Sequence, residues 1–217
     1  MIGENITLKA EYLATANVLI HQMEAQRKDK AKFVIVICGE SGSGKTVTAH
    51  CLQHLFELKG QKTALIHMDD YFHLPPQSNH ENRLKGLENV GYQEVDLALL
   101  NQHVLLFKSG EFSVQKPVVQ YQMNSILTES ISFENIDILI VEGTYTFKVE
   151  SADFKVFMSR NYIQTEEKRR LRNRGNEMND PFNNLVLAKE HELIAPFGKN
   201  VDAIIDYNYQ VIIPTNG

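Results

Sequence analysis

The stretch VICGESGSGKT, residues 36–46, decides the fold class of this 217-residue chain. It fits the pattern G-x-x-x-x-G-K-[ST] at every fixed position. The apolar, β-branched run FVIVIC, residues 33–38, leads directly into the first glycine, as expected of a strand buried on both faces of a parallel sheet. A helix is predicted to follow at residues 45–59. Because a strand, a glycine-rich turn and a helix stand in this order, we predict a P-loop that holds phosphate groups.

Each residue type in this loop suits a nucleotide triphosphate. Glycines let backbone N–H groups turn towards phosphate oxygens. Lys45 can reach the β- and γ-phosphates, and the Thr46 hydroxyl can bind Mg²⁺. The alternative is a glycine-rich turn with a chance lysine, which the flanking strand and helix disfavour. We therefore predict a site for ATP or GTP with Mg²⁺. Its residues are Gly39, Glu40, Ser41, Gly42, Ser43, Gly44, Lys45, Thr46 and Val47.

Strand patterns alternate with helix patterns along the rest of the chain. The predicted strands lie at residues 33–38, 63–68, 137–142, 154–158, 203–205 and 211–213, and the predicted helices at 8–23, 45–59, 96–108, 165–174 and 181–194. Residues 73–93 are predicted to form a long loop, and residues 112–122 are predicted to pair with 131–133 as a hairpin. The fold class predicted is α/β, a P-loop NTPase with three α/β/α layers and a mostly parallel central sheet.

Composition limits the class of protein further. A length of 217 residues with 43% hydrophobic content suits a single domain, and a formal net charge of −5 gives no general attraction to nucleic acid or to an anionic membrane. No apolar run approaches the roughly 20 residues that span a bilayer. Cys38 and Cys51 are predicted to be reduced core thiols. With no signal-peptide pattern at its N-terminus, the chain is predicted to be cytoplasmic.

Acidic side chains follow two of the predicted strands. HMDDYF, residues 67–72, places Asp69 and Asp70 after one strand, and ILIVEGTY, residues 138–145, places Glu142 at the end of another. Ligands in open α/β sheets bind at the carboxyl ends of strands, where one carboxylate can hold Mg²⁺ and another can accept the proton of a hydroxyl. The structural alternatives are a turn or helix cap for the aspartates and a surface acid for the glutamate.

A basic helix is predicted near the end of the chain. TEEKRRLRNRG, residues 165–175, contains Arg169, Arg170, Arg172 and Arg174. These side chains could form a lid that closes over the triphosphate and neutralises the moving phosphoryl group. The alternative is an ordinary solvated helix face.

In their order along the chain, GESGSGKT, MDDYF, ILIVEGTY and EKRRLRNRG make residues 33–195 resemble the uridine kinase and phosphoribulokinase family of P-loop kinases. The resemblance implies one kinase domain over residues 1–217. Within it, residues 1–30 would form an N-terminal helix, 73–134 an acceptor-binding loop, helix and hairpin, and 164–176 the arginine lid. The implied activity is transfer of a phosphoryl group from ATP or GTP to a hydroxyl of a small metabolite.

The resemblance also assigns roles to single residues. Asp69 corresponds to the general base, and Glu142 joins Thr46 at the Mg²⁺. The residues assigned to catalysis are Asp69, Lys45, Arg169, Arg170 and Arg174, and those assigned to the acceptor are Asp69, Tyr71, Glu94, Asp96, Lys116 and Tyr121. The structural alternatives are a core aromatic for Tyr121 and a helix N-cap for Asp96.

The identity of the acceptor is left open by the sequence. Uridine or cytidine is the first hypothesis for the acceptor. The chain departs from uridine kinases at two places: they usually have an aspartate and then a histidine where this chain has Gln122, Met123, Asn124 and Ser125, and in the lid Asn173 follows Arg172. Pantothenate, glycerate or a sugar phosphate is the alternative, with Arg83 and Lys85 gripping the anion. A non-catalytic nucleotide-binding regulator is the third hypothesis, although the chain lacks an N-K-x-D element. The expected partner is a small molecule with a hydroxyl group, and a homo-oligomer is one alternative for the assembly. Neither nucleic acid nor a membrane is expected as a partner.

Overall fold

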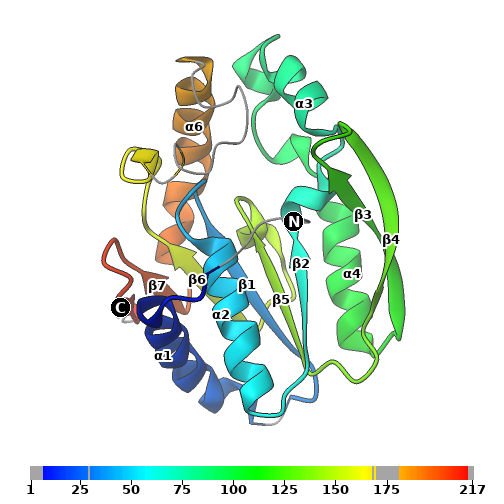
Figure 1. The fold of residues 1–217 in the computed structure, drawn as a ribbon, viewed down its shortest axis with the longest axis vertical. Coiled ribbons are helices and arrows are strands. Elements are labelled where there is room, and N and C mark those ends of the chain that lie inside the picture. Colours follow the sequence, from blue (N-terminus) through cyan, green and yellow to red (C-terminus); the bar gives the residue numbers. More distant parts are fainter. Residues whose placement is uncertain (1–6, 29, 168, 170–180, 215–217) are drawn as a thin grey trace.

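The computed structural model describes residues 7–28, 30–167, 169 and 181–214. Its centre is a six-stranded sheet in the order β2-β5-β1-β6-β7-β8 (Figure 1). The strands are β1 (Phe33–Gly39), β2 (Thr63–His67), β5 (Ile138–Gly143), β6 (Phe154–Met158), β7 (Ala203–Ile205) and β8 (Val211–Ile212). Every neighbouring pair is parallel except β7 with β8. The predicted mostly parallel sheet is therefore confirmed.

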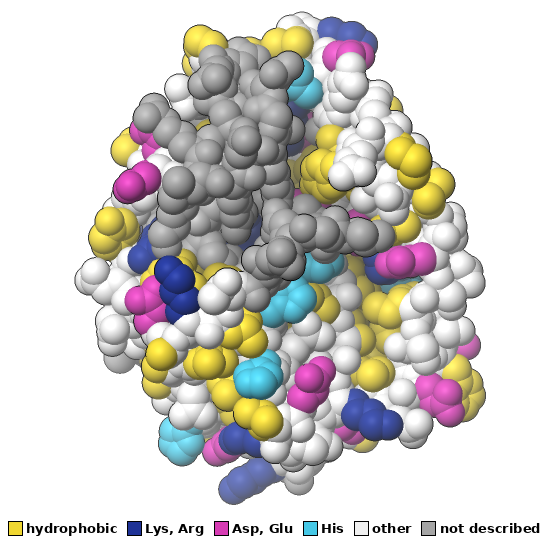
Figure 2. Space-filling model, viewed as in Figure 1, with side chains coloured by type: hydrophobic (Ala, Val, Ile, Leu, Met, Phe, Trp, Pro, Cys, Tyr) yellow, Lys and Arg dark blue, Asp and Glu magenta, His cyan; other side chains and the backbone are white. Residues whose placement is uncertain are grey.

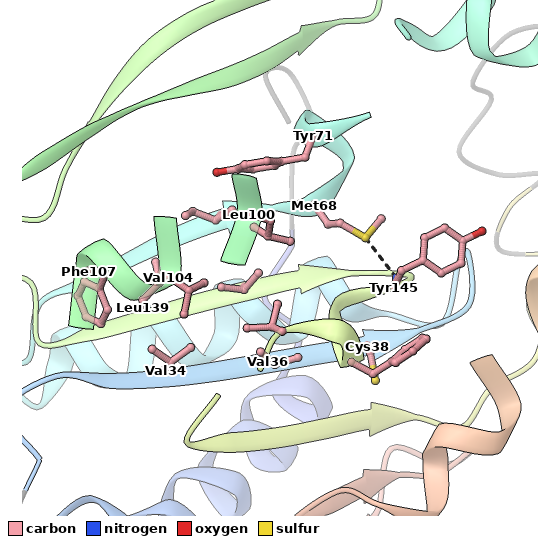
Figure 3. Close-up of a cluster of buried hydrophobic side chains, with 14 of the residues drawn as sticks. Val34, Val36, Cys38, Met68, Tyr71, Leu100, Val104, Phe107, Leu139 and Tyr145 are labelled. Carbon is pink, nitrogen blue, oxygen red and sulfur yellow. Dashed lines mark hydrogen bonds between the residues drawn. The ribbon is translucent and has the colours of Figure 1, made fainter. Parts of the chain in front are cut away.

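Helices cover both faces of this sheet because alternate side chains of a strand point to opposite faces. Phe33, Ile35 and Ile37 of β1 pack with α1 (Ala10–Arg27) and α2 (Lys45–Leu58). Val34, Val36 and Cys38 of the same strand face α4 (Leu97–Ser109), whose Leu100, Val104 and Phe107 complete that core (Figure 3). All seven residues of β1 are buried. This burial on both faces is what the unbroken apolar run in the sequence predicted, and it fixes the three-layer α/β/α class.

A hairpin stands apart from the main sheet. Strands β3 (Ser113–Gln120) and β4 (Ser125–Ser132) pair along their whole length as a separate two-stranded sheet. The predicted hairpin is confirmed, but its second strand begins six residues before the predicted 131–133 segment. The β3 strand runs beside the 3-10 turn Met68–Tyr71 that follows β2.

The prediction of an irregular loop at residues 73–93 is wrong. Helix α3 (Pro76–Arg83) lies there, followed by 3-10 turns at Leu87–Asn89 and Tyr92–Glu94. Pro76 suits the first helical position. The remaining residues of α3 are polar, so the helix lacks the apolar periodicity by which sequence analysis finds helices. Polar contacts of Asn79 and Arg83 hold it in place instead.

Helix α6 (Pro181–Ile194) confirms the last predicted helix. Of the predicted lid at residues 164–176, only residues 164–167 and 169 lie within the described part of the chain. Arg170 and Arg174 therefore fall outside the described residues. Among those that are described, no helix combines the length and apolar character needed to cross a bilayer.

The two cysteines are buried free thiols. Burial raises the pKa of Cys38 to about 12 and that of Cys51 to about 11. A thiol reacts as its thiolate, so both side chains are inert core residues at neutral pH.

Candidate active site

The P-loop runs from the end of β1 into the first turn of α2. Gly42 and Gly44 adopt positive φ angles of 75° and 107°, which residues other than glycine rarely adopt. At Gly44 a Cβ atom would lie 2.6 Å from the hydroxyl oxygen of Tyr209. The loop conformation therefore depends on glycine at this position, from which α2 begins directly at Lys45.

Two polar groups of the loop fit a bound nucleotide. The Ser43 hydroxyl is fully buried and makes no hydrogen bond within the described part of the chain. The Lys45 ammonium donates to the Glu40 carbonyl at 2.9 Å, so it lies folded across the loop. A buried hydroxyl without a partner and a lysine held over backbone amides suit phosphate oxygens, so the donor set fits a nucleotide triphosphate.

Glu40 is occupied by protein contacts. Its carboxylate is buried, accepts the backbone N–H of Tyr162, and pairs with Nδ1 of His191 on α6. This residue, predicted to bind nucleotide, thus ties the P-loop to α6. Its contribution to nucleotide binding stays a prediction.

Arg169 is the predicted lid arginine that the described residues place at the loop. Its Nη1 donates to the Tyr162 carbonyl and to Oγ1 of Thr165, the latter at 2.6 Å. The Thr165 hydroxyl in turn donates to the Ser41 carbonyl at 2.9 Å. A Cβ atom added at Gly42 would lie 2.9 Å from Cγ of Arg169. The beginning of the basic helix is therefore packed directly against the P-loop.

The two predicted magnesium ligands lie together. The Thr46 hydroxyl donates to Oε1 of Glu142 at 3.0 Å, which joins the start of α2 to the end of β5. His67, the last residue of β2, donates from Nδ1 to the same oxygen at 2.7 Å. Both bonds end on Oε1, which leaves Oε2 as the oxygen suited to Mg²⁺ or to one of its waters. Hydroxyl and carboxylate oxygens are the ligands that Mg²⁺ prefers, so this pair fits the cation.

His67 is a site residue that sequence analysis missed. Burial by itself would raise the pKa of Glu142. The bond from His67, followed by the charges of His67 and Lys45, outweighs burial and lowers that pKa to about 2. His50 lies beside His67, with ring centroids 6.3 Å apart, and histidine side chains gather on this face over α2 and β2 (Figure 2). His67 therefore keeps Glu142 ionised and oriented.

Replacing His67 with alanine is expected to lower the free energy of unfolding by about 3 kcal/mol, since it breaks a buried pair and leaves Glu142 without its strongest partner. The pKa of Glu142 in the folded protein lies below its ordinary value of 4.5, so ionised Glu142 stabilises the fold above pH 4.5. This stabilisation is lost as the pH falls through about 2. Without His67 that pKa rises, so acid unfolding should begin at a higher pH. Urea titrations between pH 2 and 8 measure both effects. His54→Ala, an exposed change on α2, is the control.

The two aspartates after β2 have different surroundings. Asp69 is partly buried in the turn Met68–Tyr71. Asp70 is buried, accepts the Lys116 ammonium at 2.8 Å and accepts the backbone N–H of Val119 at 3.0 Å. The structure thus commits Asp70 to anchoring the hairpin. Asp69 stands at the sheet edge beside the Glu142 site, because β2 and β5 are neighbours.

The end of β5 approaches this turn closely. A Cβ atom added at Gly143 would lie 2.3 Å from Cβ of Met68, a contact that no larger residue could make without moving the backbone. Glycine after Glu142 therefore sets the spacing between the magnesium pair and the Asp69 turn.

The other residues predicted to bind the acceptor are mostly engaged with protein partners. The Tyr71 hydroxyl bonds Nδ1 of His103 at 2.8 Å, and both side chains are buried. Asp96 caps α4 by accepting a hydrogen bond from the Leu99 N–H at 2.9 Å. This contact is that of a helix N-cap, the structural alternative considered for Asp96. Tyr121 lies in the hairpin turn, 41% exposed.

Lys116 and Glu94 sit in buried ion pairs. The Lys116 ammonium contacts both Asp70 and Glu129 at 2.8 Å and is 4% exposed as a residue. Glu94 accepts bonds from Arg83 of α3 and from the Asn79 amide at 2.9 Å. The roles of these two residues in acceptor binding therefore stay predictions.

The fold, the P-loop and the Thr46–Glu142 pair define a P-loop kinase-like protein. The model of the Phosphoribulokinase / Uridine kinase family matches residues 34–213. The chain belongs to this family, as the four sequence landmarks predicted.

Relatives with assigned names differ in their acceptors. The chain is 30% identical over 186 residues to the bifunctional alpha-galactosidase/sucrose kinase AgaSK of Mediterraneibacter gnavus, covering 80% of this chain but only 20% of that longer protein. It is 30% identical over 185 residues to a uridine kinase of Macrococcus caseolyticus, covering 79% of this chain and 86% of that enzyme.

Solved structures confirm the fold. A possible uridine kinase from Bacillus stearothermophilus superposes with a TM-score of 0.64 at 18% identity, covering 88% of this chain and 97% of that one. A D-glycerate 3-kinase from Cryptococcus neoformans gives a TM-score of 0.60 at 13% identity, covering 94% and 98%. At these identities the likeness concerns the fold alone.

Proposed function

We propose that this protein transfers the γ-phosphoryl group of ATP or GTP to a hydroxyl of a small metabolite, with Mg²⁺, in the cytoplasm. The observation that carries the proposal is the contact of Thr46 with Glu142 directly beside the P-loop lysine, with Asp69 at the end of the neighbouring strand. A protein that only holds a nucleotide needs the P-loop lysine, Thr46 and Glu142. A carboxylate placed to take a proton from an acceptor is what a kinase needs in addition.

In the proposed reaction, Asp69 accepts the proton of the acceptor hydroxyl as that oxygen forms a bond to the γ-phosphorus. The bond from the γ-phosphorus to the bridging oxygen breaks, and the nucleoside diphosphate leaves with that electron pair. Lys45 and Arg169 offset the negative charge that spreads over the phosphoryl oxygens. Thr46 and Glu142 would hold Mg²⁺, which supplies neutralisation of the β- and γ-oxygens when bound. Positioning and electrostatics therefore account for most of the proposed rate enhancement.

Uridine or cytidine, phosphorylated at the 5′-hydroxyl, leads as the acceptor, supported by the similarity to uridine kinases over most of both chains. Sucrose is the second candidate, because the sucrose kinase-containing relative matches at the same identity over a similar stretch.

The proposal is tested by incubating the purified protein with MgATP or MgGTP and each acceptor in turn, following nucleoside diphosphate release. Uridine, cytidine, sucrose, pantothenate, glycerate and ribulose 5-phosphate form the set. Release that rises with one acceptor and saturates supports the proposal. Equal release with and without every acceptor would favour a nucleotide-binding regulator instead.

A further inference from the structure

The P-loop carries an acidic side chain beside the place for the phosphates. Glu40 follows the first glycine of the loop, and its carboxylate is buried. A negative charge at this position opposes the binding of a triphosphate, since charges of the same sign repel more strongly where water is excluded. A loop that receives phosphates therefore needs this carboxylate to be offset and held in a fixed direction.

Partners outside the loop hold the Glu40 carboxylate. Oε2 accepts the backbone N–H of Tyr162, and Oε1 pairs with Nδ1 of His191 on α6. A carboxylate offers only acceptors, so Nδ1 of His191 is the donor. The charge of Arg169 also reaches Glu40, but within the described part of the chain its guanidinium donates to Tyr162 and Thr165 instead. His191 is therefore the side chain that fixes the direction of this carboxylate.

The backbone of Glu40 organises the rest of the loop. Its carbonyl accepts the Ser43 N–H at 3.2 Å and the Lys45 ammonium at 2.9 Å. A turn of the peptide unit at residue 40 would therefore displace both groups. Since the side chain of Glu40 bonds His191 and its carbonyl bonds Lys45, this one residue connects α6 to the lysine of the P-loop.

Helix α6 is itself held on another side. The Arg83 guanidinium of α3 donates to Oε1 of Glu190, the residue before His191, at 3.2 Å. Further along, the Leu193 carbonyl accepts the Tyr92 hydroxyl at 2.9 Å. Successive residues of a helix lie about 100° apart around its axis, so Glu190 and His191 reach different neighbours. α3 and α6 stand at the same end of the molecule (Figure 1). His191 therefore projects from an anchored support.

We infer that His191 is a positioning residue of the nucleotide site. It holds Glu40, and through Glu40 the P-loop lysine, in the arrangement that receives the triphosphate. The inference goes beyond the proposed function, because it gives a role to a residue of α6 that acts only through another side chain. Its effect on the rate of transfer rests on the proposed function, whereas its effect on nucleotide affinity does not.

The first experiment measures nucleotide binding, which needs no acceptor. The unmodified protein and its variants are titrated calorimetrically with AMP-PNP and Mg²⁺, and with GMP-PNP and Mg²⁺ alongside. His191→Leu should raise the Kd about fivefold to tenfold, because the buried carboxylate loses a donor and the loop loses its anchor. His191→Asn places an amide N–H where Nδ1 stands, so its Kd should stay within about twofold of the unmodified protein.

Glu192→Gln is the matched control for this titration. Glu192 is the next residue of α6 and pairs with Lys189 among described residues, so its replacement should leave the Kd unchanged. An unchanged Kd in folded His191→Leu protein would overturn the inference. Absence of binding of both analogues to the unmodified protein would overturn the inference together with the proposed function.

The second experiment tests whether His191 acts through Glu40. Glu40→Gln keeps an acceptor for the Tyr162 N–H but removes the charge that His191 orients. In a double-mutant cycle, adding His191→Leu to Glu40→Gln should therefore raise the Kd by no more than about twofold. If the two changes instead multiply in full, as independent sites do, His191 acts by another route and the inference is wrong.

The third experiment separates positioning from folding. With saturating nucleotide, His191→Leu should lower kcat about tenfold while KM for the acceptor stays constant, because the acceptor side is untouched. His191→Asn should restore most of kcat. A lower Tm accompanied by normal nucleotide Kd and normal kcat would make His191 a purely structural residue. If no acceptor gives turnover, the proposed function fails, and the binding titrations still decide the inference.

Discussion

Replacing Asp69 with asparagine is expected to reduce kcat by about 10²- to 10⁴-fold, the usual loss when a positioned general base is removed. Asparagine keeps the size of the side chain but cannot accept the proton of the acceptor hydroxyl. The KM for ATP should stay nearly constant, because the P-loop is untouched. Steady-state assays over a range of both substrates measure the two effects separately.

Asp70→Asn is the neighbouring comparison for that experiment. It weakens the buried pair with Lys116, so its main effect should be a lower free energy of unfolding, by about 3 kcal/mol. Asp69 lies partly exposed, and its replacement should change stability far less. Undiminished turnover by the Asp69 variant would contradict the general-base assignment. A loss confined to stability would place Asp69 with Asp70 as a structural residue.

Replacing Lys45 with methionine is expected to reduce kcat by about 10²- to 10³-fold, comparable to the removal of one preorganised donor to a transition-state charge. Methionine retains much of the side-chain length but has no charge for the β- and γ-phosphates. Among described groups Lys45 bonds only the Glu40 carbonyl, so its loss should change stability little.

Lys59→Met is the matched control, because Lys59 follows the other end of α2 and pairs with Glu24 at the surface. Single-turnover measurements with saturating MgATP separate the chemical step from binding. Normal single-turnover rates for the Lys45 variant would contradict the role of the P-loop in transfer.

Residues close together in the sequence were predicted well. The P-loop, its flanking strand and helix, and the carboxylates at the ends of β2 and β5 follow local patterns, because a buried parallel strand reads as an unbroken apolar run. The bond between Thr46 and Glu142 confirms that their two positions meet, although 96 residues separate them. The shared edge of a parallel sheet made that meeting predictable.

Contacts formed between distant polar residues were not predictable from pattern. Lys116 suggested a ligand contact, yet Asp70, 46 residues earlier, holds it in an ion pair. Glu190 belongs to a helix whose sequence gives no sign that Arg83 approaches it. Helix α3 was missed because contacts of this kind, rather than an apolar face, stabilise it. His67 looks like an ordinary residue at the end of a strand, and only its bond to Glu142 reveals its role.

The anchoring of the β3–β4 hairpin by Asp70 has a consequence for binding entropy. Detaching the hairpin would leave Asp70 and Lys116 as separated charges in a place where each is about 95% buried, a loss of several kcal/mol. Hairpin and Asp69 turn therefore form one stiff unit before any ligand arrives. Ordering a loop on binding normally lowers affinity, because conformational entropy is lost. A hairpin that is ordered before binding avoids this loss, so more of the contact energy remains to discriminate between ligands.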